Sequence, residues 1–298
     1  MQFPPPLTPG CRVRVIAPAG PFDHALVWRG LSALSARYRV EYSREMFVAH
    51  GFLAGSDQRR HAELSQALAE PGLSAIIAAR GGYGLTRIAP RVDWSLLQRH
   101  PKWLVGFSDI TVMHLEAQRV GVASLHAHNC AGLGRYDAGR HAEWFEALER
   151  PKPVCHALSP VRAGQARGTL VGGNLTLIAA QSAARRLKLP ARAILVLEEV
   201  GEAPYHLDRL LTALLESGDL SPVAGVVLGD FVDCGPGRYA VSAAQVLAER
   251  LEKLGVPLAS GLAVGHANIN RPLVLGSQAQ LTVTASSAQL SIGGGGSA

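Results

Sequence analysis

Short apolar runs alternate with amphipathic helices through the first half of the chain, and this alternation limits the possible folds more than any other feature. The runs cover residues 13–16, 40–42, 75–79, 103–107 and 122–125. Asp23 and Ser56 are placed to cap helices whose apolar positions recur at intervals of three and four. Strands that alternate with helices predict a parallel sheet covered on both faces. We therefore expect an N-terminal α/β domain of the Rossmann or flavodoxin kind.

The pattern weakens around residues 134–166, where a helical stretch at 143–148 is followed by several prolines. Prolines in such a stretch are typical of a domain boundary. Beyond it, strands and helices follow in mixed order, at residues 168–174, 175–178, 193–197, 204–215, 226–228, 243–254, 262–265, 280–283 and 289–292. We expect residues 1–140 to form the first domain, 141–166 a linker region and 167–292 a mixed α/β second domain. Residues 293–298 resemble a flexible linker.

The composition excludes several classes of protein. The 298 residues are 48% hydrophobic and 17% charged, which indicates a compact globular chain. The formal net charge is +6, but the basic residues are scattered, so a nucleic-acid partner is not expected. The four cysteines lie far apart without a C-x-x-C pair, which indicates reduced thiols rather than a zinc site. No signal-like N-terminus and no apolar run of ~20 residues is present, so a cytoplasmic protein is expected.

Ser108 lies where a predicted strand turns into a predicted helix. The apolar run at 103–107 precedes it, and Ile110, Met113 and Ala117 then recur at helical spacing. Such a turn exposes the serine oxygen above a sheet edge and directs free backbone N–H groups toward whatever that oxygen attacks. This is the logic of a nucleophile elbow, although G-F-S-D lacks the second glycine of G-x-S-x-G. The alternative is that Ser108 only caps the helix.

A glycine-rich turn, R-G-G-Y-G at residues 80–84, follows another predicted strand directly. It lacks the G-x-G-x-x-G spacing and the lysine of the known phosphate-binding loops. Glycine also lets bare N–H groups approach a tetrahedral intermediate, as an oxyanion hole requires. The remaining alternative is a tight turn with no chemical role. We call residues 80–84 the glycine turn.

Three residues in the second half could complete the chemistry of a serine nucleophile. Glu198 and Glu199 end an apolar strand on opposite faces, and either carboxylate could orient a histidine. His266 follows a predicted short strand at 262–265, a plausible seat for a general base. His126 and His128 are the rival bases, and H-x-H without a nearby acid is weak support for a metal site.

Taken together, these stretches resemble the LD-carboxypeptidase family of serine peptidases, which includes murein tetrapeptide carboxypeptidases and microcin C self-immunity peptidases. The resemblance covers nearly the whole chain and rests on these motifs in family order: VIAPAG (15–20), LAGSD (53–57), ARGGYG (79–84), GFSDIT (106–111), GGNL (172–175), LEEVGE (197–202) with PY (204–205) and DR (208–209), and GH (265–266). The resemblance implies that Ser108 is the nucleophile, Glu198 the charge-relay acid and His266 the base. It also implies an N-terminal domain that carries the serine and a C-terminal domain that carries the other two.

The chain departs from the family pattern in two places. The family usually has an aspartate after Leu-Glu, where this chain has Glu199, so the choice between Glu198 and Glu199 is less clean. The family also tends to read His-Gly where this chain has H-A-H-N at 126–129, which bears on the substrate more than on the mechanism.

The resemblance implies release of the terminal D-alanine from an L,D-linked murein tetrapeptide, with neither metal nor organic cofactor, by a protein that forms a homodimer. By analogy with other elbows, the backbone N–H groups of Gly82 and Asp109 are expected to form the oxyanion hole. Arg80 and Arg271 are candidates for binding the substrate carboxylate, because a guanidinium can donate two parallel hydrogen bonds. Tyr83 is a further substrate-binding candidate. The alternatives are a microcin-type peptidyl-nucleotide peptidase and a non-catalytic anion-binding module.

Overall fold

The computed structural model describes residues 1–136 and 138–293 of the chain. It divides into two compact units. The N-terminal unit comprises Met1–Pro151 and Arg271–Leu275, and the C-terminal unit comprises Lys152–Asn270 and Gly276–Ala298. The linker-like tail expected at 293–298 lies outside the described residues except for Gly293.

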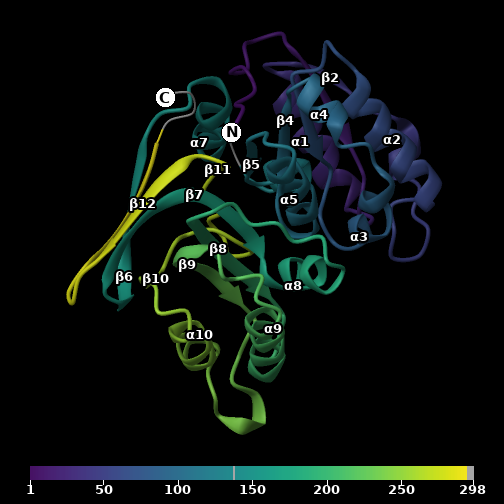
Figure 1. Ribbon diagram of the computed structural model, residues 1–298. Helices are drawn as coiled ribbons and strands as arrows, with labels where there is room; N and C mark the ends of the chain where they lie inside the picture. Colours follow the sequence, from purple (N-terminus) through teal and green to yellow (C-terminus); the bar gives the residue numbers. More distant parts are fainter. Residues whose placement is uncertain (137, 294–298) are drawn as a thin grey trace. The chain divides into compact units, whose positions relative to one another are not determined.

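The N-terminal unit is an α/β layer structure with helices on both faces of one sheet (Figure 1). Its elements are β1 (Arg12–Ile16), α1 (His24–Ser35), β2 (Arg39–Glu41), η1 (Arg44–Phe47), α2 (Asp57–Ala69), β3 (Ala75–Ala78), α3 (Leu85–Ile88), η2 (Ala89–Arg91), α4 (Ser95–Arg99), β4 (Trp103–Gly106), η3 (Ser108–Ile110), α5 (Thr111–Arg119), β5 (Ser124–His126), α6 (Cys130–Leu133), α7 (Ala138–Glu149) and β11 (Leu273–Leu275).

The strand order of this sheet is β2-β1-β3-β4-β5-β11. The first five strands are parallel, and their order, 2-1-3-4-5, is that of the flavodoxin-like doubly wound sheet. The sixth strand, β11, pairs antiparallel with β5. The α/β class expected from the alternating pattern is therefore confirmed.

Burial on both faces explains why these strands read as continuous apolar runs. One row across the sheet, in register from β1 to β5, packs into the core beside α1: Val15, Ile77, Val105 and Leu125. The alternate positions Ile76 and Leu104 are also fully buried, so the opposite face is covered as well. The expected caps are present, because Asp23 accepts N–H hydrogen bonds at the start of α1 and Ser56 does so at α2.

The C-terminal unit is a closed seven-strand barrel in the order β10-β6-β13-β12-β7-β8-β9. Its elements are β6 (Val154–Arg162), β7 (Gly164–Asn174), α8 (Leu175–Ala183), β8 (Ala193–Val200), α9 (Pro204–Glu216), β9 (Val223–Val232), η4 (Gly237–Tyr239), α10 (Ala243–Glu252), β10 (Leu258–Ser260), β12 (Gln278–Val283) and β13 (Ala288–Ile292).

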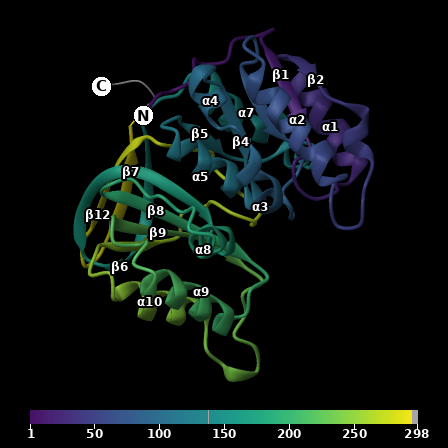
Figure 2. The same ribbon diagram turned by 45° about the vertical axis from the view of Figure 1, so that its right-hand side comes forward.

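This unit combines strands and helices, as expected for this half of the chain, and its barrel contains both parallel and antiparallel pairs. Strands β7 to β10 run parallel and are linked in turn by α8, α9 and α10, while β6, β12 and β13 complete the circuit with antiparallel pairs. Helices α9 and α10 lie side by side in both views (Figures 1 and 2). No helix among the described residues is long and apolar enough to span a membrane.

One expected strand is wrong. Residues 262–265 form no strand, and the strand of this region is β10 (Leu258–Ser260). Residues 262–264 still lie along β9, because the Leu262 N–H donates to the Leu228 carbonyl and the Asp230 N–H donates to the Val264 carbonyl. The positive φ of Gly261, 88°, breaks the ladder after β10.

Candidate active site

The carboxyl ends of β1, β3 and β4 meet at one edge of the N-terminal sheet. In an open parallel sheet, ligands bind outside these ends, at the point where the strand order reverses. Here that point lies between β1 and β3. The loop after β1, the glycine turn after β3 and Ser108 after β4 therefore gather where the fold favours a site.

Ser108 adopts a backbone conformation that a non-glycine residue rarely takes. Its φ is 67°, in the left-handed region, and it opens the short 3-10 helix η3 (Ser108–Ile110). Neither η3 nor α5 receives a side-chain capping hydrogen bond, so helix capping does not account for this serine. Backbone strain of this kind costs roughly 1–3 kcal/mol and concentrates at functional positions. The geometry is that of a nucleophile elbow.

The glycine turn packs directly against Ser108. A Cβ atom added to Gly81 would lie 2.7 Å from Ser108 Cβ and 3.0 Å from its Oγ, so only glycine fits there. The Gly81 carbonyl accepts a hydrogen bond of 3.0 Å from the Gly20 N–H, which ties the turn to the loop after β1. Gly82 has a φ of 100°, the left-handed range that glycine tolerates.

The backbone donors expected for an oxyanion hole are available. Within the described residues, neither the Gly82 N–H nor the Asp109 N–H donates a hydrogen bond to another protein group. The first N–H groups of a helix have no intrahelical partner, which explains the case of Asp109. Gly82 is exposed, whereas the Asp109 side chain is fully buried.

Glu198 and His266 form a hydrogen-bonded pair within the C-terminal unit. The Oε2 atom of Glu198 lies 2.7 Å from Nδ1 of His266. Glu198 is fully buried and His266 retains 18% side-chain exposure, so the carboxylate is shielded while the imidazole reaches the surface. Burial raises the pKa of Glu198, and the hydrogen bond and charge of His266 oppose that rise. This arrangement can fix the tautomer of the histidine with its proton on Nδ1, which makes Nε2 the basic nitrogen.

The Glu199 carboxylate instead accepts hydrogen bonds from backbone and side-chain donors around the start of α8. Its Oε1 accepts hydrogen bonds from Asn174 Nδ2 at 2.7 Å and from the Val200 N–H at 2.9 Å. Its Oε2 accepts from the Thr176 N–H at 2.8 Å, in the first turn of α8. The alternation along β8 thus sends Glu198 to His266 and Glu199 to the start of α8.

The loop that carries His266 lies between two carboxylates, one of which sequence reasoning missed. A Cβ added to Gly265 would lie 3.0 Å from Glu198 Oε2 and 3.2 Å from Asp230 Cβ. Burial raises the pKa of Asp230, and the Ala267 backbone N–H and His266 lower it. The only sequence signal for Asp230 is its position just after the apolar run at 226–228.

The two rival histidines belong to the N-terminal unit. His126 is buried on β5, with ring contacts to Phe107 and His114 at centroid distances of 6.0 Å. Burial lowers the pKa of His128 to about 4, and its ring lies 5.0 Å from that of Tyr136. Among the described residues, no cluster of three or more His, Cys, Asp or Glu side chains could hold a metal ion.

The three substrate-binding candidates lie at the surface. Arg80 is exposed and donates a hydrogen bond of 2.6 Å to the Pro21 carbonyl. Tyr83 is 47% exposed, and its ring lies 5.6 Å from that of Phe52. Arg271 forms an exposed ion pair of 2.7 Å with Glu143.

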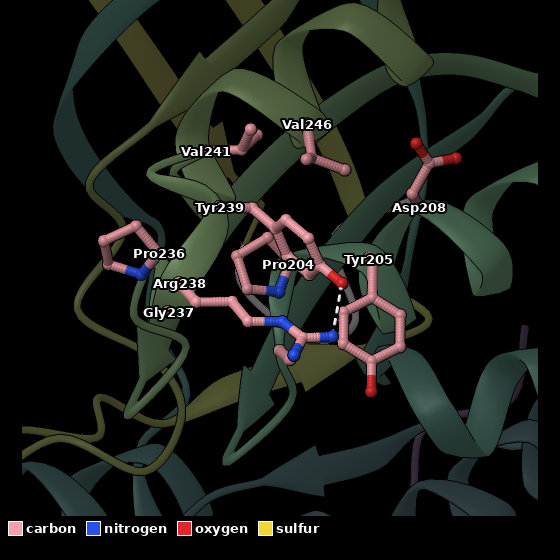
Figure 3. Close-up of a pocket in the computed structure, with 10 residues that line it drawn as sticks. Pro204, Tyr205, Asp208, Pro236, Gly237, Arg238, Tyr239, Val241 and Val246 are labelled. Atoms are coloured by element: carbon pink, nitrogen blue, oxygen red, sulfur yellow. Dashed lines mark hydrogen bonds between the residues drawn. The ribbon is translucent and has the colours of Figure 1, made fainter.

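A hollow of about 720 Å³ lies elsewhere in the C-terminal unit, between the start of α9, the loop after β9 and α10 (Figure 3). Figure 3 shows the Arg238 guanidinium beside the Tyr239 hydroxyl, to which it donates a hydrogen bond of 2.6 Å. Asp208 at its rim is already paired with Arg250. Neither Glu198 nor His266 lines this hollow.

Comparison with known proteins matches both halves of the chain. Residues 13–127 match the LD-carboxypeptidase N-terminal domain, and residues 167–281 match the LD-carboxypeptidase C-terminal domain. A murein tetrapeptide carboxypeptidase of Pseudomonas aeruginosa is 34% identical, over 91% of this chain and 92% of that protein. A crystal structure of a muramoyltetrapeptide carboxypeptidase from Oxalobacter formigenes superimposes with a TM-score of 0.84 at 28% identity, covering 95% of this chain and 98% of the other.

An MccF-like protein of Bacillus anthracis shares the fold with a TM-score of 0.89, over 99% of this chain and 100% of that one. At 19% identity, that likeness extends to the fold alone. The Pseudomonas relative and the two matched domains decide the family. The chain belongs to the LD-carboxypeptidase family of peptidases.

Proposed function

We propose that this protein is a serine carboxypeptidase that hydrolyses the L,D-bond of a murein tetrapeptide and releases the terminal D-alanine. One observation carries the enzymatic part of the proposal. Ser108 has a left-handed backbone conformation at the end of β4, and it lies so close to Gly81 that a side chain at position 81 would collide with it. The substrate part draws on the Pseudomonas relative, whose name specifies murein tetrapeptide.

In the proposed reaction, Ser108 Oγ bonds to the carbonyl carbon of the scissile amide while His266 Nε2 takes the hydroxyl proton. The carbonyl oxygen becomes an oxyanion, to which the N–H groups of Gly82 and Asp109 donate. Collapse of this intermediate breaks the C–N bond, and His266 returns its proton to the departing amine of D-alanine. A water molecule, deprotonated by the same imidazole, then attacks the acyl-serine, which yields the shortened peptide and restores Ser108.

Glu198 is proposed to hold His266 in the tautomer that carries its proton on Nδ1, so that Nε2 is the basic nitrogen, and to stabilise the imidazolium that forms. The hydrogen bond of 2.7 Å to Nδ1 supports this role. Glu199 is left out of the mechanism, because its two oxygens already accept three hydrogen bonds around the start of α8.

The free carboxylate of the substrate needs a cationic partner, and Arg80 or Arg271 is proposed for it, with Tyr83 nearby on the glycine turn. The exposed positions of all three support access to a peptide. We further propose a cytoplasmic location and a homodimer, as the family resemblance implies, and a reaction that uses the protein's own residues without a cofactor.

The deciding experiment offers the purified protein three peptides: a murein tetrapeptide with a free terminus, its C-terminal amide and an all-L version. Release of free D-alanine from the first, with poor cleavage of the other two, is the expected result. The amide removes the charge that an arginine would bind, and inversion of the last centre misdirects its side chain. Similar rates for all three peptides would contradict a carboxypeptidase.

The second candidate function is a microcin C-type peptidyl-nucleotide peptidase. The shared fold with the MccF-like protein favours it, since MccF is the microcin C7 self-immunity protein. Preferential cleavage of an aminoacyl-nucleotide over D-alanine would select this candidate. A non-catalytic anion-binding module is the third, and labelling of Ser108 by an active-site serine probe separates it from both enzymes.

A further inference from the structure

The residue after the proposed nucleophile carries a buried carboxyl group that the mechanism above does not use. Asp109 is fully buried, and its Oδ2 accepts a hydrogen bond of 2.9 Å from the Leu85 N–H. Its Oδ1 is buried without a hydrogen-bond partner among the described residues. Burial raises the pKa of this carboxyl to about 7. A buried acid at such a cost in desolvation calls for a reason.

Arg60 of α2 binds the carbonyl oxygen of the peptide group whose N–H belongs to Leu85. Its side chain is fully buried, and its Nη1 donates to the Gly84 carbonyl at 2.9 Å and to the Pro18 carbonyl at 2.5 Å. The Gly84 carbonyl and the Leu85 N–H belong to one planar peptide unit. That unit is therefore held at its oxygen by Arg60 and at its nitrogen by Asp109.

The clamped peptide is the end of the glycine turn. The turn begins at Arg80, passes Gly81 in contact with Ser108, and finishes at Gly84, whose φ is 133°. A Cβ on Gly84 would lie 2.7 Å from Arg60 Nη1, so the guanidinium fills the space that a side chain would take. Because glycines leave a turn many conformations, its geometry must come from such outside contacts.

Asp109 is joined to Ser108 by a peptide bond, so its hydrogen bond to Leu85 fixes the glycine turn relative to the nucleophile. We propose that Asp109 and Arg60 are positioning residues: together they clamp the Gly84–Leu85 peptide and so hold the Gly82 N–H in register with Ser108 Oγ. This inference rests on the proposed function for the identity of the nucleophile, and it adds a role for two buried side chains. A clamp for stability alone is the competing explanation.

The test compares Asp109→Ala, which removes the acceptor, with Asp109→Asn, which keeps an oxygen that can accept from Leu85. Glu149→Ala and Glu149→Gln are the matched controls. Glu149 also accepts hydrogen bonds in this unit, from Arg37 and Tyr38, and it contributes to neither the glycine turn nor the turn at Ser108. Thermal midpoints of all four variants record any general loss of stability.

Two readouts distinguish positioning from stability. The first is kcat and KM for D-alanine release, together with substrate affinity in a Ser108→Ala background. The second is the rate at which a fluorophosphonate labels Ser108, which requires the same oxyanion donors but no murein substrate. Loss of one oxyanion donor typically lowers kcat by about 10²–10³-fold.

We expect Asp109→Ala to lower kcat and the labelling rate in parallel by about 10²-fold, with KM and binding almost unchanged, and Asp109→Asn to recover most of that loss. If folded Asp109→Ala labels and turns over like the Glu149 variants, the positioning role is overturned. If wild type labels at Ser108 and the rate depends on Asp109, but no D-alanine is released, then the positioning role stands and only the proposed substrate fails. Absence of any labelling at Ser108 in wild type would overturn both.

Discussion

The end of β4 and the end of β8 hold their polar side chains by different physical means. At β4 the close approach of two backbone segments limits the space around the serine, because Ser108 is left-handed and Gly81 leaves no space beside it. At β8 the side chains determine the geometry, because the buried Glu198 carboxylate holds His266 through one hydrogen bond. A site of the first kind is sensitive to added volume, and a site of the second kind is sensitive to lost charge. This contrast tells which substitutions should damage each end.

The largest effect is expected at the end of β4, from removal of the proposed nucleophile. Ser108→Ala should lower kcat by about 10⁴-fold or more, the usual loss for the nucleophile of a triad. The fold should survive, since alanine fits wherever serine does and the hydroxyl caps no helix. D-alanine release and the thermal midpoint measure the two quantities. A folded variant with near-native turnover would remove Ser108 from the mechanism.

At the end of β8, two adjacent carboxylates allow an internal control. Glu198→Gln should lower kcat by about 10²–10⁴-fold, because His266 loses the acid proposed to orient it. Glu199→Gln should leave kcat nearly intact and instead lower stability by about 1–2 kcal/mol, since three donors lose a charged acceptor. Turnover and urea unfolding midpoints separate the two effects. Mild and equal losses of turnover in both variants would contradict the assignment.

The same contrast explains how far the sequence could predict the site. The strand-to-helix change placed Ser108 at a turn, and the alternation on β8 separated Glu198 from Glu199, because periodicity follows directly from backbone geometry. The pairing of Glu198 with His266 depended on the family resemblance. These residues lie far apart in sequence, and no local pattern says that their side chains meet.

Strands whose residues show no apolar periodicity were not predicted from the sequence. β6 has mostly exposed or half-buried side chains, and β11 is only three residues long, so neither shows a clear apolar period. Closure of the barrel depends on β10 pairing with both β6 and β9, which no local sequence pattern specifies. Arg60 did leave a signal: it precedes Leu64 by four positions and therefore lies on the apolar face of α2, where an arginine indicates a buried role.

An added methyl group next to Ser108 should lower turnover at the β4 end. In Gly81→Ala, the new methyl group would lie 2.7 Å from Ser108 Cβ, so one of the two turns must shift. A misplacement of about 1 Å at a reacting group can cost 10²-fold, and we expect kcat to fall by roughly 10- to 10²-fold. Gly235→Ala is the control, because nothing lies within 4 Å of its added Cβ. Equal turnover in the two variants would show that the contact with Gly81 is not needed.

The last expected effect concerns the pH dependence of the buried Asp109 carboxyl at the β4 end, and it is measured in stability. Burial raises the pKa of Asp109 to about 7, well above the ordinary value of an aspartate carboxyl. Between pH 4 and 7, the folded chain therefore holds a proton that the unfolded chain has released, so this group makes the fold less stable as the pH rises.

Other groups act in the opposite direction. Burial lowers the pKa of His114 and of His128 to about 4, so these histidines favour the fold increasingly as the pH rises from about 4 toward 6.5.

The pH profile of wild-type stability therefore contains contributions of both signs. The useful quantity is the difference in unfolding free energy between wild type and Asp109→Asn. Their stability difference should shift in favour of the variant by at most about 1.4 kcal/mol per pH unit across the window from about 4 to 7, and then level off. Glu198 lies in the other unit, so its own raised pKa should cancel in this difference. Urea unfolding midpoints at pH 5, 6, 7 and 8 measure it, with Glu149→Gln as the control. A difference that stays constant over this range would mean that Asp109 is ionised in the folded protein, and that Arg60 compensates its charge at the β4 end as His266 does for Glu198 at the β8 end.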